Sequence, residues 1–549
     1  MLEGVVPYPP DFQEAYREKG YWEDRSLRDE LQPCLEKFAE RVAVIDGTGR
    51  YTYGELDRLS TGLALNLVAL GLKPLDRVVI QLPNVREFAV LYVALQKAGC
   101  IPIAALVTHR FAEISQFVAL SGARACVIPD VIRGFDYREM AARVRAENDR
   151  LEHLIVMGEA TGDSLSLHEL IERPPALGAD ALDAIPIDPT DPAVFQLSGG
   201  TTGIPKLIPR THNDYAYNSK QAARETEVTP DSRLLIVLPI AHNLPLACPG
   251  LQGYLMNGAA VVLSTSARAP DAFAMIEKHR VTHVIGVPAL HIGWINDPAA
   301  ADRDLSSVRM IGSGGQRLQP EVKRRMREVY PNAFVQENFG MAEGTLMFVK
   351  RTDSEDAQLE TVGQPMCPDD EVMLLDEEDN VVPFGEVGEF CVRGPYTLRG
   401  YFAADEHNAR AFTNDGFYRS GDLLRQHPSG NYMVEGRIKD LINRGGEKIS
   451  AEEIENLILM HPAVRNVACV PMPDARLGER MCAFLILHPG RDISLEALVA
   501  FLETREIARF KLPERIEVVD SFPVSDFGKV SKKTLVETIS AKLAQESEG

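Results

Sequence analysis

Short apolar runs alternate with helical patterns along much of the chain. Residues 77–82 and 101–106 are two such runs and predict buried strands, and residues 88–99 between them carry apolar side chains at helical spacing. A strand, a helix and a second strand in this order are typical of a parallel sheet covered by helices on both faces. The alternation continues with predicted strands at 234–238, 260–263 and 283–287 and a predicted helix at 271–279.

The pattern changes twice in the last third of the chain. After about residue 360, short runs such as Glu371–Leu375 and Gly388–Arg393 are separated by turn residues, which predicts a small barrel-like or meander subdomain. Near Gly436 it changes again, because Ser450-Ala-Glu-Glu453 is a capping box that predicts the start of a helix. Strands near 467–470 and 482–487 and a helix from Ser494 complete a predicted α+β module, and the acidic residues 545–549 are expected to be frayed.

Length, charge and cysteine usage limit the possible classes of protein. The chain has 549 residues, and one core stops growing at about 250–300 residues, so we expect a large body and a smaller domain. The net charge of -21 argues against a broad nucleic-acid or acidic-lipid surface, so an anionic ligand needs a local site. The eight cysteines form no CxxC pair, and neither a signal peptide nor an apolar run of about 18 residues is visible, which favours a cytoplasmic protein.

One glycine-rich loop carries the first chemical signal. Ser198-Gly-Gly-Thr-Thr-Gly203 combines three glycines with three hydroxyl side chains, and it follows a predicted strand that includes Phe195. Glycines let backbone N–H groups approach a phosphate, hydroxyls add donors, and Lys206 adds a positive charge. The string lacks the Gly-Lys-Ser/Thr ending of a P-loop. The alternative is a flexible surface loop of small residues.

The longer string from Leu197 to Lys206 resembles the signature loop of the adenylate-forming superfamily, which includes acyl-CoA synthetases, luciferases and the adenylation domains of nonribosomal peptide synthesis. Further strings that resemble this family's motifs follow in order and extend the resemblance over essentially the whole chain: Asn338-Phe-Gly-Met-Ala-Glu343, Tyr418-Arg-Ser-Gly-Asp422, Gly436-Arg-Ile-Lys-Asp440, Arg444-Gly-Gly-Glu-Lys448 and Gly528-Lys529.

The resemblance implies a role for each motif in ATP binding. It assigns Glu343 to Mg²⁺, Asp422 and Arg437 to the ribose, and Lys529 to the carboxylate and the α-phosphate as the key catalytic cation. Without the motifs, Glu343 and Lys529 would be ordinary surface charges, and Gly312-Ser-Gly-Gly315 would be a tight turn. The implied phosphate and adenine contacts are Ser198, Gly199, Gly200, Thr201, Thr202, Gly203, a loop-steadying Lys206, Gly314, Gly315, Phe339 and Gly340.

The resemblance also implies an α/β fold with a mobile C-terminal domain. Residues 1–436 would form the adenylation domain, of parallel-sheet subdomains and the small barrel-like subdomain, and residues 437–549 the α+β lid. The hinge would lie at 437–440, with Lys439 at its centre. After rotation the loop with Gly445 and Gly446 would face the site while a pantetheine thiol attacks the adenylate, although two glycines there would also suit a plain turn.

The closer resemblance is to the stand-alone aryl-acid adenylating enzymes of siderophore pathways. It is carried by Pro239-Ile-Ala-His-Asn-Leu-Pro-Leu-Ala-Cys-Pro-Gly250, Phe339-Gly-Met-Ala-Glu-Gly344, Arg393-Gly-Pro-Tyr-Thr-Leu-Arg-Gly-Tyr401 and Ile442-Asn-Arg-Gly-Gly-Glu-Lys448. In that group the acid pocket includes the positions of His242, Asn243, Leu244, Cys248, Gly314 and Leu346.

These pocket positions indicate an aromatic ring with an ortho hydroxyl. Asn243 would hydrogen-bond that hydroxyl, and His242 would lie against the carboxylate and the AMP, as a catalytic residue. Cys248 and Leu346 replace the Ser and Val of 2,3-dihydroxybenzoate enzymes, which favours salicylate because a thiol is a weak donor and Leu is bulkier than Val. Leu244 stands where the group has Tyr or Phe, and 2,3-dihydroxybenzoate or another ortho-substituted aromatic acid remains the alternative. Asn338 likewise replaces an apolar residue.

The remaining expectations concern partners. No phosphopantetheine attachment sequence follows Lys529, so the acceptor thiol is expected on a separate aryl carrier protein or on CoA. ATP and Mg²⁺ are the expected cofactors, and both a monomer and a homodimer stay open. An aryl-CoA or acyl-CoA ligase, a luciferase-like enzyme and a binding protein without activity are the rival interpretations, the last opposed by intact Glu343, Asp422, Arg437 and Lys529.

Overall fold

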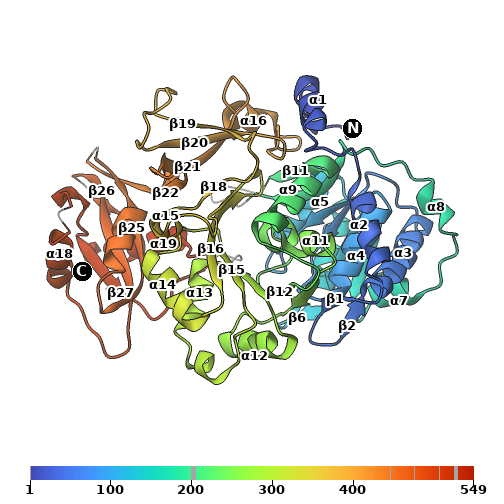
Figure 1. The fold of residues 1–549 in the computed structure, drawn as a ribbon, viewed down its shortest axis with the longest axis horizontal. Helices are drawn as coiled ribbons and strands as arrows, with labels where there is room; N and C mark the ends of the chain where they lie inside the picture. Colours follow the sequence, from blue (N-terminus) through green and yellow to red (C-terminus); the bar gives the residue numbers. More distant parts are fainter. Residues whose placement is uncertain are drawn as a thin grey trace.

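A computed structural model describes residues 2–198, 206–445, 447–474, 476–505, 507–524 and 529–548. Within this part of the chain the strands form sheets of nine, seven, five and four strands and a two-stranded ribbon, β6 (Val131–Ile132) and β7 (Phe135–Asp136). The two large sheets with their helices make up most of the molecule, and the C-terminal part lies at the opposite end from the first helices (Figure 1). The α/β fold predicted from the sequence is confirmed.

The seven-stranded sheet is parallel apart from the edge pair β10–β11. Its strands, in spatial order, are β11 (Leu207–Thr211), β10 (Pro192–Leu197), β4 (Ile101–Ala104), β3 (Arg77–Ile80), β5 (Ala125–Pro129), β8 (His153–Met157) and β9 (Leu165–Ser166).

The nine-stranded sheet is parallel in its middle and antiparallel at both ends. Its strands, in spatial order, are β18 (Gln364–Pro365), β17 (Gly344–Phe348), β16 (Phe334–Met341), β15 (Met310–Ser313), β14 (His283–Gly286), β12 (Arg233–Ile236), β13 (Ala260–Leu263), β1 (Val42–Ile45) and β2 (Arg50–Thr52).

Three layers of apolar side chains hold these sheets together, because successive residues of a strand point to opposite faces. Val78 and Ile80 of β3 share one buried core with Leu234 and Ile236 of β12, so this core lies between the two sheets. The helices that contribute to this core are α2 (Leu27–Lys37), α3 (Tyr53–Ala69), α4 (Arg86–Lys97), α7 (Leu167–Glu172), α8 (Asp180–Asp183), α9 (His212–Glu225), α10 (Asn243–Ala247) and α11 (Gly250–Leu255).

The outer faces of the two sheets are covered separately. Val79 points away from the shared core into a second cluster, with α5 (Phe111–Ser121) and α6 (Tyr137–Ala146). Leu235 of β12 points into a third cluster, with α12 (Ala269–His279), α13 (Pro288–Ile295) and α14 (Pro320–Val329). The remaining short helices are α1 (Pro10–Glu18), η1 (Pro298–Asp302), α15 (Glu355–Glu360) and α16 (Asp405–Ala411).

Two smaller sheets follow in the chain. The predicted subdomain after residue 360 is an antiparallel meander of β19 (Glu371–Leu375), β20 (Gly388–Arg393), β21 (Tyr418–Gln426) and β22 (Tyr432–Arg437). The C-terminal sheet contains β23 (Leu441–Arg444), β24 (Glu447–Ser450), β25 (Val464–Asp474), β26 (Gly478–Leu487) and β27 (Arg515–Val518), with helices α17 (Ala451–Ile458), α18 (Leu495–Glu503) and α19 (Lys532–Glu548). Between the sheets lies η2 (Ile438–Asp440), and η3 (Arg509–Lys511) precedes β27.

The ends of most predicted elements agree with the structure within a few residues. The predicted helix after Ser450 is α17, and the Ser450 side chain accepts a hydrogen bond from the backbone N–H of Glu453. The expectation of a frayed end is wrong for residues 545–548, since α19 continues to Glu548, and Gly549 lies outside the described residues. Arg515 holds the last turns of that helix through an ion pair of 2.6 Å with Glu546.

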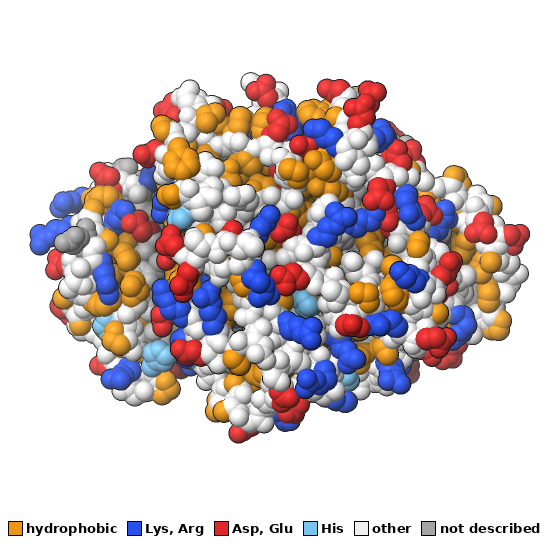
Figure 2. Space-filling view, in the orientation of Figure 1, with side chains coloured by type: hydrophobic (Ala, Val, Ile, Leu, Met, Phe, Trp, Pro, Cys, Tyr) orange, Lys and Arg blue, Asp and Glu red, His pale blue; other side chains and the backbone are white. Residues whose placement is uncertain are grey.

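The surface carries no continuous basic area on the face that Figure 2 shows, where acidic and basic side chains are intermixed. In the described residues, no helix is both long and apolar enough to cross a membrane.

Candidate active site

The predicted phosphate loop connects the antiparallel strands β10 and β11. Gly199, Gly200, Thr201, Thr202 and Gly203 lie outside the described residues, but both ends of the loop are described. The backbone N–H of Ser198 donates to the carbonyl of Lys206 at 3.0 Å, and the N–H of Lys206 donates to the Ser198 hydroxyl at 2.9 Å. The strand pairing therefore continues to the base of the loop.

A buried carboxylate lies near Lys206, at the described end of this loop. Glu343 follows β16 and is 9% exposed, and its Oε1 accepts a hydrogen bond from the Tyr401 hydroxyl at 2.7 Å. The Tyr401 and Tyr418 hydroxyl oxygens are 3.0 Å apart, and the ammonium of Lys206 lies 5.9 Å from the centre of the Tyr401 ring. Burial raises the pKa of Glu343 above its ordinary value. A nearby cation would stabilise the ionised form of such a buried carboxylate.

The second carboxylate of the site comes from the meander. Asp422 on β21 is opposite Arg437 on β22 in the strand register, and Arg437 Nε donates to Asp422 Oδ1 at 2.5 Å. Asp422 is 3% exposed, whereas Arg437 is exposed. Asp422 raises the pKa of Arg437 through its opposite charge. Tyr418 begins the same strand, so one strand links this pair to Glu343.

Lys529 brings the C-terminal part of the chain to these groups. Burial, and then the positive charge of Arg437, lower the pKa of Lys529 to about 8, while Asp422 acts in the opposite direction. Burial, followed by the charge of Lys529, lowers the pKa of His242 to about 3, so His242 is neutral at pH 7. Lys529 is thus within electrostatic reach of both His242 and the Asp422–Arg437 pair.

The residues of the predicted acid pocket lie around α10. His242 is the residue before this helix, and Asn243 begins it. Cys248 and Leu346 belong to one buried cluster, and Leu244 packs against it, although the three come from two separate segments of the chain. Burial raises the pKa of Cys248 to about 11, so it is a neutral thiol at pH 7.

Tyr396 lies behind Leu346 and is fully buried. Its hydroxyl accepts a hydrogen bond from the backbone N–H of Leu346 at 3.1 Å and donates to Asp370 Oδ2 at 2.6 Å. Burial raises the pKa of Asp370 to about 8. A Cβ on Gly394 would lie 2.0 Å from Asp370 Oδ1, so a larger residue there would collide with this carboxyl group.

The predicted adenine contacts gather at the ends of β15 and β16. A Cβ on Gly314 would lie 2.1 Å from Asn338 Oδ1, and one on Gly340 would lie 2.3 Å from Leu346 Cδ2, so larger side chains cannot be placed without movement. Gly315 is exposed with φ +89, a turn conformation that glycine tolerates. Phe339 packs edge-on against Phe390, with ring centres 5.5 Å apart.

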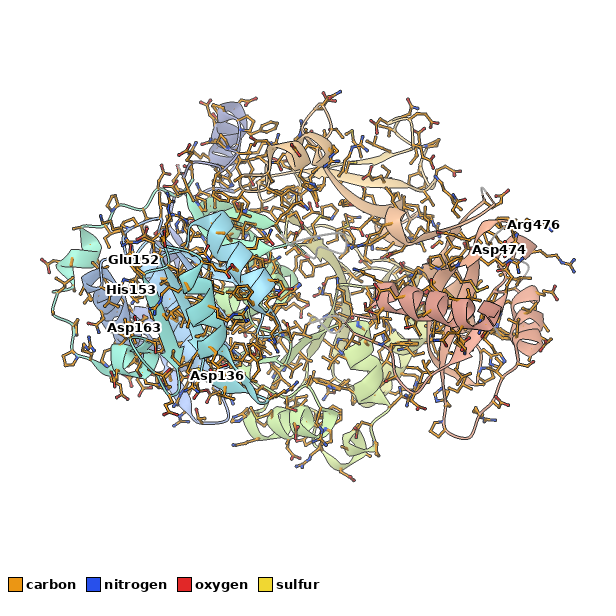
Figure 3. All side chains as sticks on the ribbon, turned by 180° about the vertical axis from the view of Figure 1, so that it is seen from behind. Asp136, Glu152, His153, Asp163, Asp474 and Arg476 are labelled. Carbon is orange, nitrogen blue, oxygen red and sulfur yellow. The ribbon has the colours of Figure 1, made fainter. Side chains whose placement is uncertain are left out.

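The predicted hinge and thiol-transfer loop follow the meander. Lys439 is in η2, between β22 of one sheet and β23 of the next. Gly445 has φ +62 in the turn between β23 and β24, and its N–H donates to the Leu477 carbonyl at 2.8 Å. Gly446 lies outside the described residues. Figure 3 shows Asp474 and Arg476, from the turn that includes Leu477, at the end of the molecule away from Asp136.

Three residues of this region were missed by the sequence analysis. Tyr401 and Tyr418 lie inside quoted motifs, but nothing in the motifs indicates that their hydroxyls meet beside Glu343. Tyr215, whose hydroxyl contacts Asn243, is on α9 and has the periodicity of an ordinary core residue. Only the three-dimensional arrangement identifies these tyrosines.

Comparison with protein families identifies the chain. The model of the AMP-binding enzyme matches residues 31–402, and that of the AMP-binding enzyme C-terminal domain matches residues 453–529. The chain belongs to the family of AMP-binding enzymes. This AMP-binding enzyme is a ligase, as the sequence predicted.

Individual relatives of this AMP-binding enzyme extend over nearly its whole length. It is 45% identical to a salicylyl-CoA synthase / salicylate adenylyltransferase from a Streptomyces species, with 98% of each chain covered. It is 43% identical to 2,3-dihydroxybenzoate-AMP ligase from Bacillus subtilis, with 99% of each covered. The apo structure of MbtA from Mycobacterium smegmatis is 41% identical, with a TM-score of 0.75 over 97% of this chain and 98% of that one. The relatives support activation of an aryl acid through an adenylate.

Proposed function

We propose that this enzyme joins an aromatic acid with an ortho hydroxyl, with salicylate preferred, to the AMP part of ATP. In the first step a carboxylate oxygen attacks the α-phosphorus, and the bond to the departing pyrophosphate breaks. In the second step a phosphopantetheine thiol attacks the acyl carbon, loses its proton, and releases AMP. The observation that carries the proposal is that Lys529 lies within electrostatic reach of His242 on the acid side and of the hydrogen-bonded Asp422–Arg437 pair on the nucleotide side.

The described side chains suit the first step. The reactants are both anions, so catalysis depends on positioning and on neutralising charge. Lys529 is the group proposed to reach both the carboxylate and the α-phosphate, and a half-buried ammonium interacts more strongly with anions than a fully exposed one. Asp422 is an acceptor suited to the ribose hydroxyls, and Arg437 holds its carboxylate in place. Neutral His242 lies against the acid without adding a charge.

Mg²⁺ is proposed to bind at Glu343. The described part of the chain contains no group of three or more His, Cys, Asp or Glu side chains that could hold a metal alone. Mg²⁺ typically uses one or two carboxylates together with substrate phosphates, so the single buried Glu343, near Lys206 at the end of the phosphate loop, fits this ion. When bound, the ion neutralises phosphate charge. The role of Tyr401 is to hold one oxygen of that carboxylate in position.

The C-terminal domain is proposed to begin at residue 437 and to rotate about Lys439 before the thiol-transfer step. The short η2 between two separate sheets supports a hinge there. The thiol belongs to an aryl carrier protein in this proposal, or to CoA, since both end in the same phosphopantetheine arm. Product analysis with each acceptor separates the two.

The acid is tested by ATP–pyrophosphate exchange with salicylate, 2,3-dihydroxybenzoate and benzoate in parallel. Packing of Cys248 and Leu346 in one buried cluster supports the preference for salicylate, because a thiol is only a weak donor for a 3-hydroxyl and Leu occupies more space than Val. We expect the highest kcat/KM with salicylate. A strong preference for 2,3-dihydroxybenzoate would overturn the assignment of these two residues, and no exchange with any aromatic acid would overturn the proposed substrate class.

A further inference from the structure

A chain of buried hydrogen bonds runs from the phosphate loop to the acid pocket. Gln196 Nε2 donates to the Tyr215 hydroxyl oxygen at 3.2 Å, the Tyr215 hydroxyl donates to Asn243 Oδ1 at 2.8 Å, and Asn243 Nδ2 lies 3.2 Å from Cys248 Sγ. All four residues are buried. Gln196 is in β10, two residues before Ser198, so this series of hydrogen bonds begins at the base of the loop.

The direction of these hydrogen bonds follows from the chemistry of their donors. An amide nitrogen can only donate, so the oxygen of Tyr215 accepts from Gln196 and its own proton is available for Asn243. Burial raises the pKa of Tyr215 well above its usual value, so this proton is retained. Asn243 must then accept with Oδ1, which turns its NH₂ group toward Cys248 and the pocket.

The tyrosine that sets this direction is itself held on several sides. The guanidinium of Arg210 lies 4.7 Å from the centre of the Tyr215 ring, and Gln252 Nε2 donates to the Tyr215 carbonyl at 3.0 Å. Arg210 in turn forms a fully buried ion pair of 2.8 Å with Asp214. The carbonyl contact fixes the backbone of Tyr215, and rotation of its side chain away from Asn243 would lose the contact of the ring with Arg210.

We propose that Tyr215 is a positioning residue that makes the pocket select an acid with a hydrogen-bond acceptor at the ortho position. This inference rests on the proposed function. One hydrogen of the Asn243 NH₂ group points to Cys248, and the other is left for the acid. The ortho hydroxyl of salicylate donates its single proton to its own carboxylate and leaves an acceptor oxygen. The ortho amine of anthranilate keeps a second N–H, which would face the Asn243 donor.

The test compares kcat/KM for salicylate and anthranilate in ATP–pyrophosphate exchange, using the full-length enzyme and its Tyr215→Phe variant. This change keeps the ring over Arg210 but removes the proton that fixes Asn243, whose amide can then turn over. We expect the salicylate/anthranilate ratio to fall about tenfold, with little change in the KM for ATP. The ratio does not depend on the fraction of folded enzyme, so partial instability does not obscure it.

Tyr53→Phe is the matched control. Tyr53 is also fully buried, and its hydroxyl donates to the Ala259 carbonyl at 2.6 Å. The control therefore removes a comparable hydrogen bond that is not part of the series from Gln196 to Cys248. Its acid ratio should equal that of the wild type. If Tyr215→Phe leaves the ratio unchanged, or Tyr53→Phe lowers it equally, the role of Tyr215 is wrong while the proposed function stands. If the wild type activates no aromatic acid, the proposed function itself fails.

Discussion

The lowered pKa of Lys529 predicts that the rate of adenylation depends on pH just above neutrality. Its amine has a pKa of about 8 because partial burial and the positive charge of Arg437 both disfavour the charged form. If the charged form is the catalyst, activity is full below this pH and is lost above it. At pH 9 about one Lys529 in eleven is still charged, so kcat/KM for ATP should be about tenfold lower than on the plateau, because kcat/KM reports pKa values of the free enzyme.

The assay is ATP–pyrophosphate exchange between pH 6.5 and 10. The decline in kcat should begin at a higher pH than that in kcat/KM, since bound ATP favours the ammonium form. Lys529→Arg keeps its charge at every pH in this range, so its remaining activity should lack the decline. Lys529→Ala should slow exchange by about 10²–10³, the usual effect of losing one preorganised donor.

Direct labelling of the amine provides an independent measurement. The rate at which acetic anhydride modifies Lys529, followed by peptide mass spectrometry, should rise with a midpoint near pH 8, and ATP should shift that midpoint upward. A wild-type kcat/KM that stays constant to pH 9.5, or the same decline in Lys529→Arg, would refute the assignment of Lys529 as the titrating catalyst.

Three further predictions concern the surroundings of the site. Tyr401→Phe removes the hydrogen bond to Glu343 and should raise the Mg²⁺ concentration for half-maximal exchange about five- to tenfold; an unchanged value would exclude a positioning role. Cys248→Ser combined with Leu346→Val should move the preference from salicylate toward 2,3-dihydroxybenzoate by at least about tenfold, measured by exchange. Asp370 has a raised pKa, so this group should lower the free energy of unfolding by up to about 1.4 kcal/mol for each unit that the pH rises between 4 and 8. Urea unfolding of the wild type should show this decrease, and urea unfolding of Asp370→Asn should not.

The sequence predicted the fold well wherever local patterns decide the structure. Buried parallel strands are continuous apolar runs, so β13 (Ala260–Leu263) was predicted with its observed ends. Ser450 marked the start of α17 through a side-chain contact three residues away. The end of α19 could not be found in this way, because its stability depends on Arg515, which is distant in sequence from Glu546.

The sequence likewise predicted some features of the candidate site and missed others. The motifs locate Glu343, Asp422 and Lys529 along the chain, and the structure places their charges within reach of one another. The contacts of Tyr401 with Glu343 and of Tyr215 with Asn243 join segments 58 and 28 residues apart. Neither contact has a local pattern, since a buried tyrosine in a helix or loop looks the same whether or not its hydroxyl orients a neighbour.

The central claim is that the acid and AMP become covalently joined through the carboxylate oxygen. Salicylate labelled with ¹⁸O in its carboxylate should be turned over in the presence of ATP and a phosphopantetheine thiol, and the AMP analysed by mass spectrometry. The mechanism predicts one ¹⁸O atom in each AMP released by thiol transfer, because the attacking oxygen stays on phosphorus. Unlabelled AMP, or ADP with the label in inorganic phosphate, would contradict an acyl-adenylate.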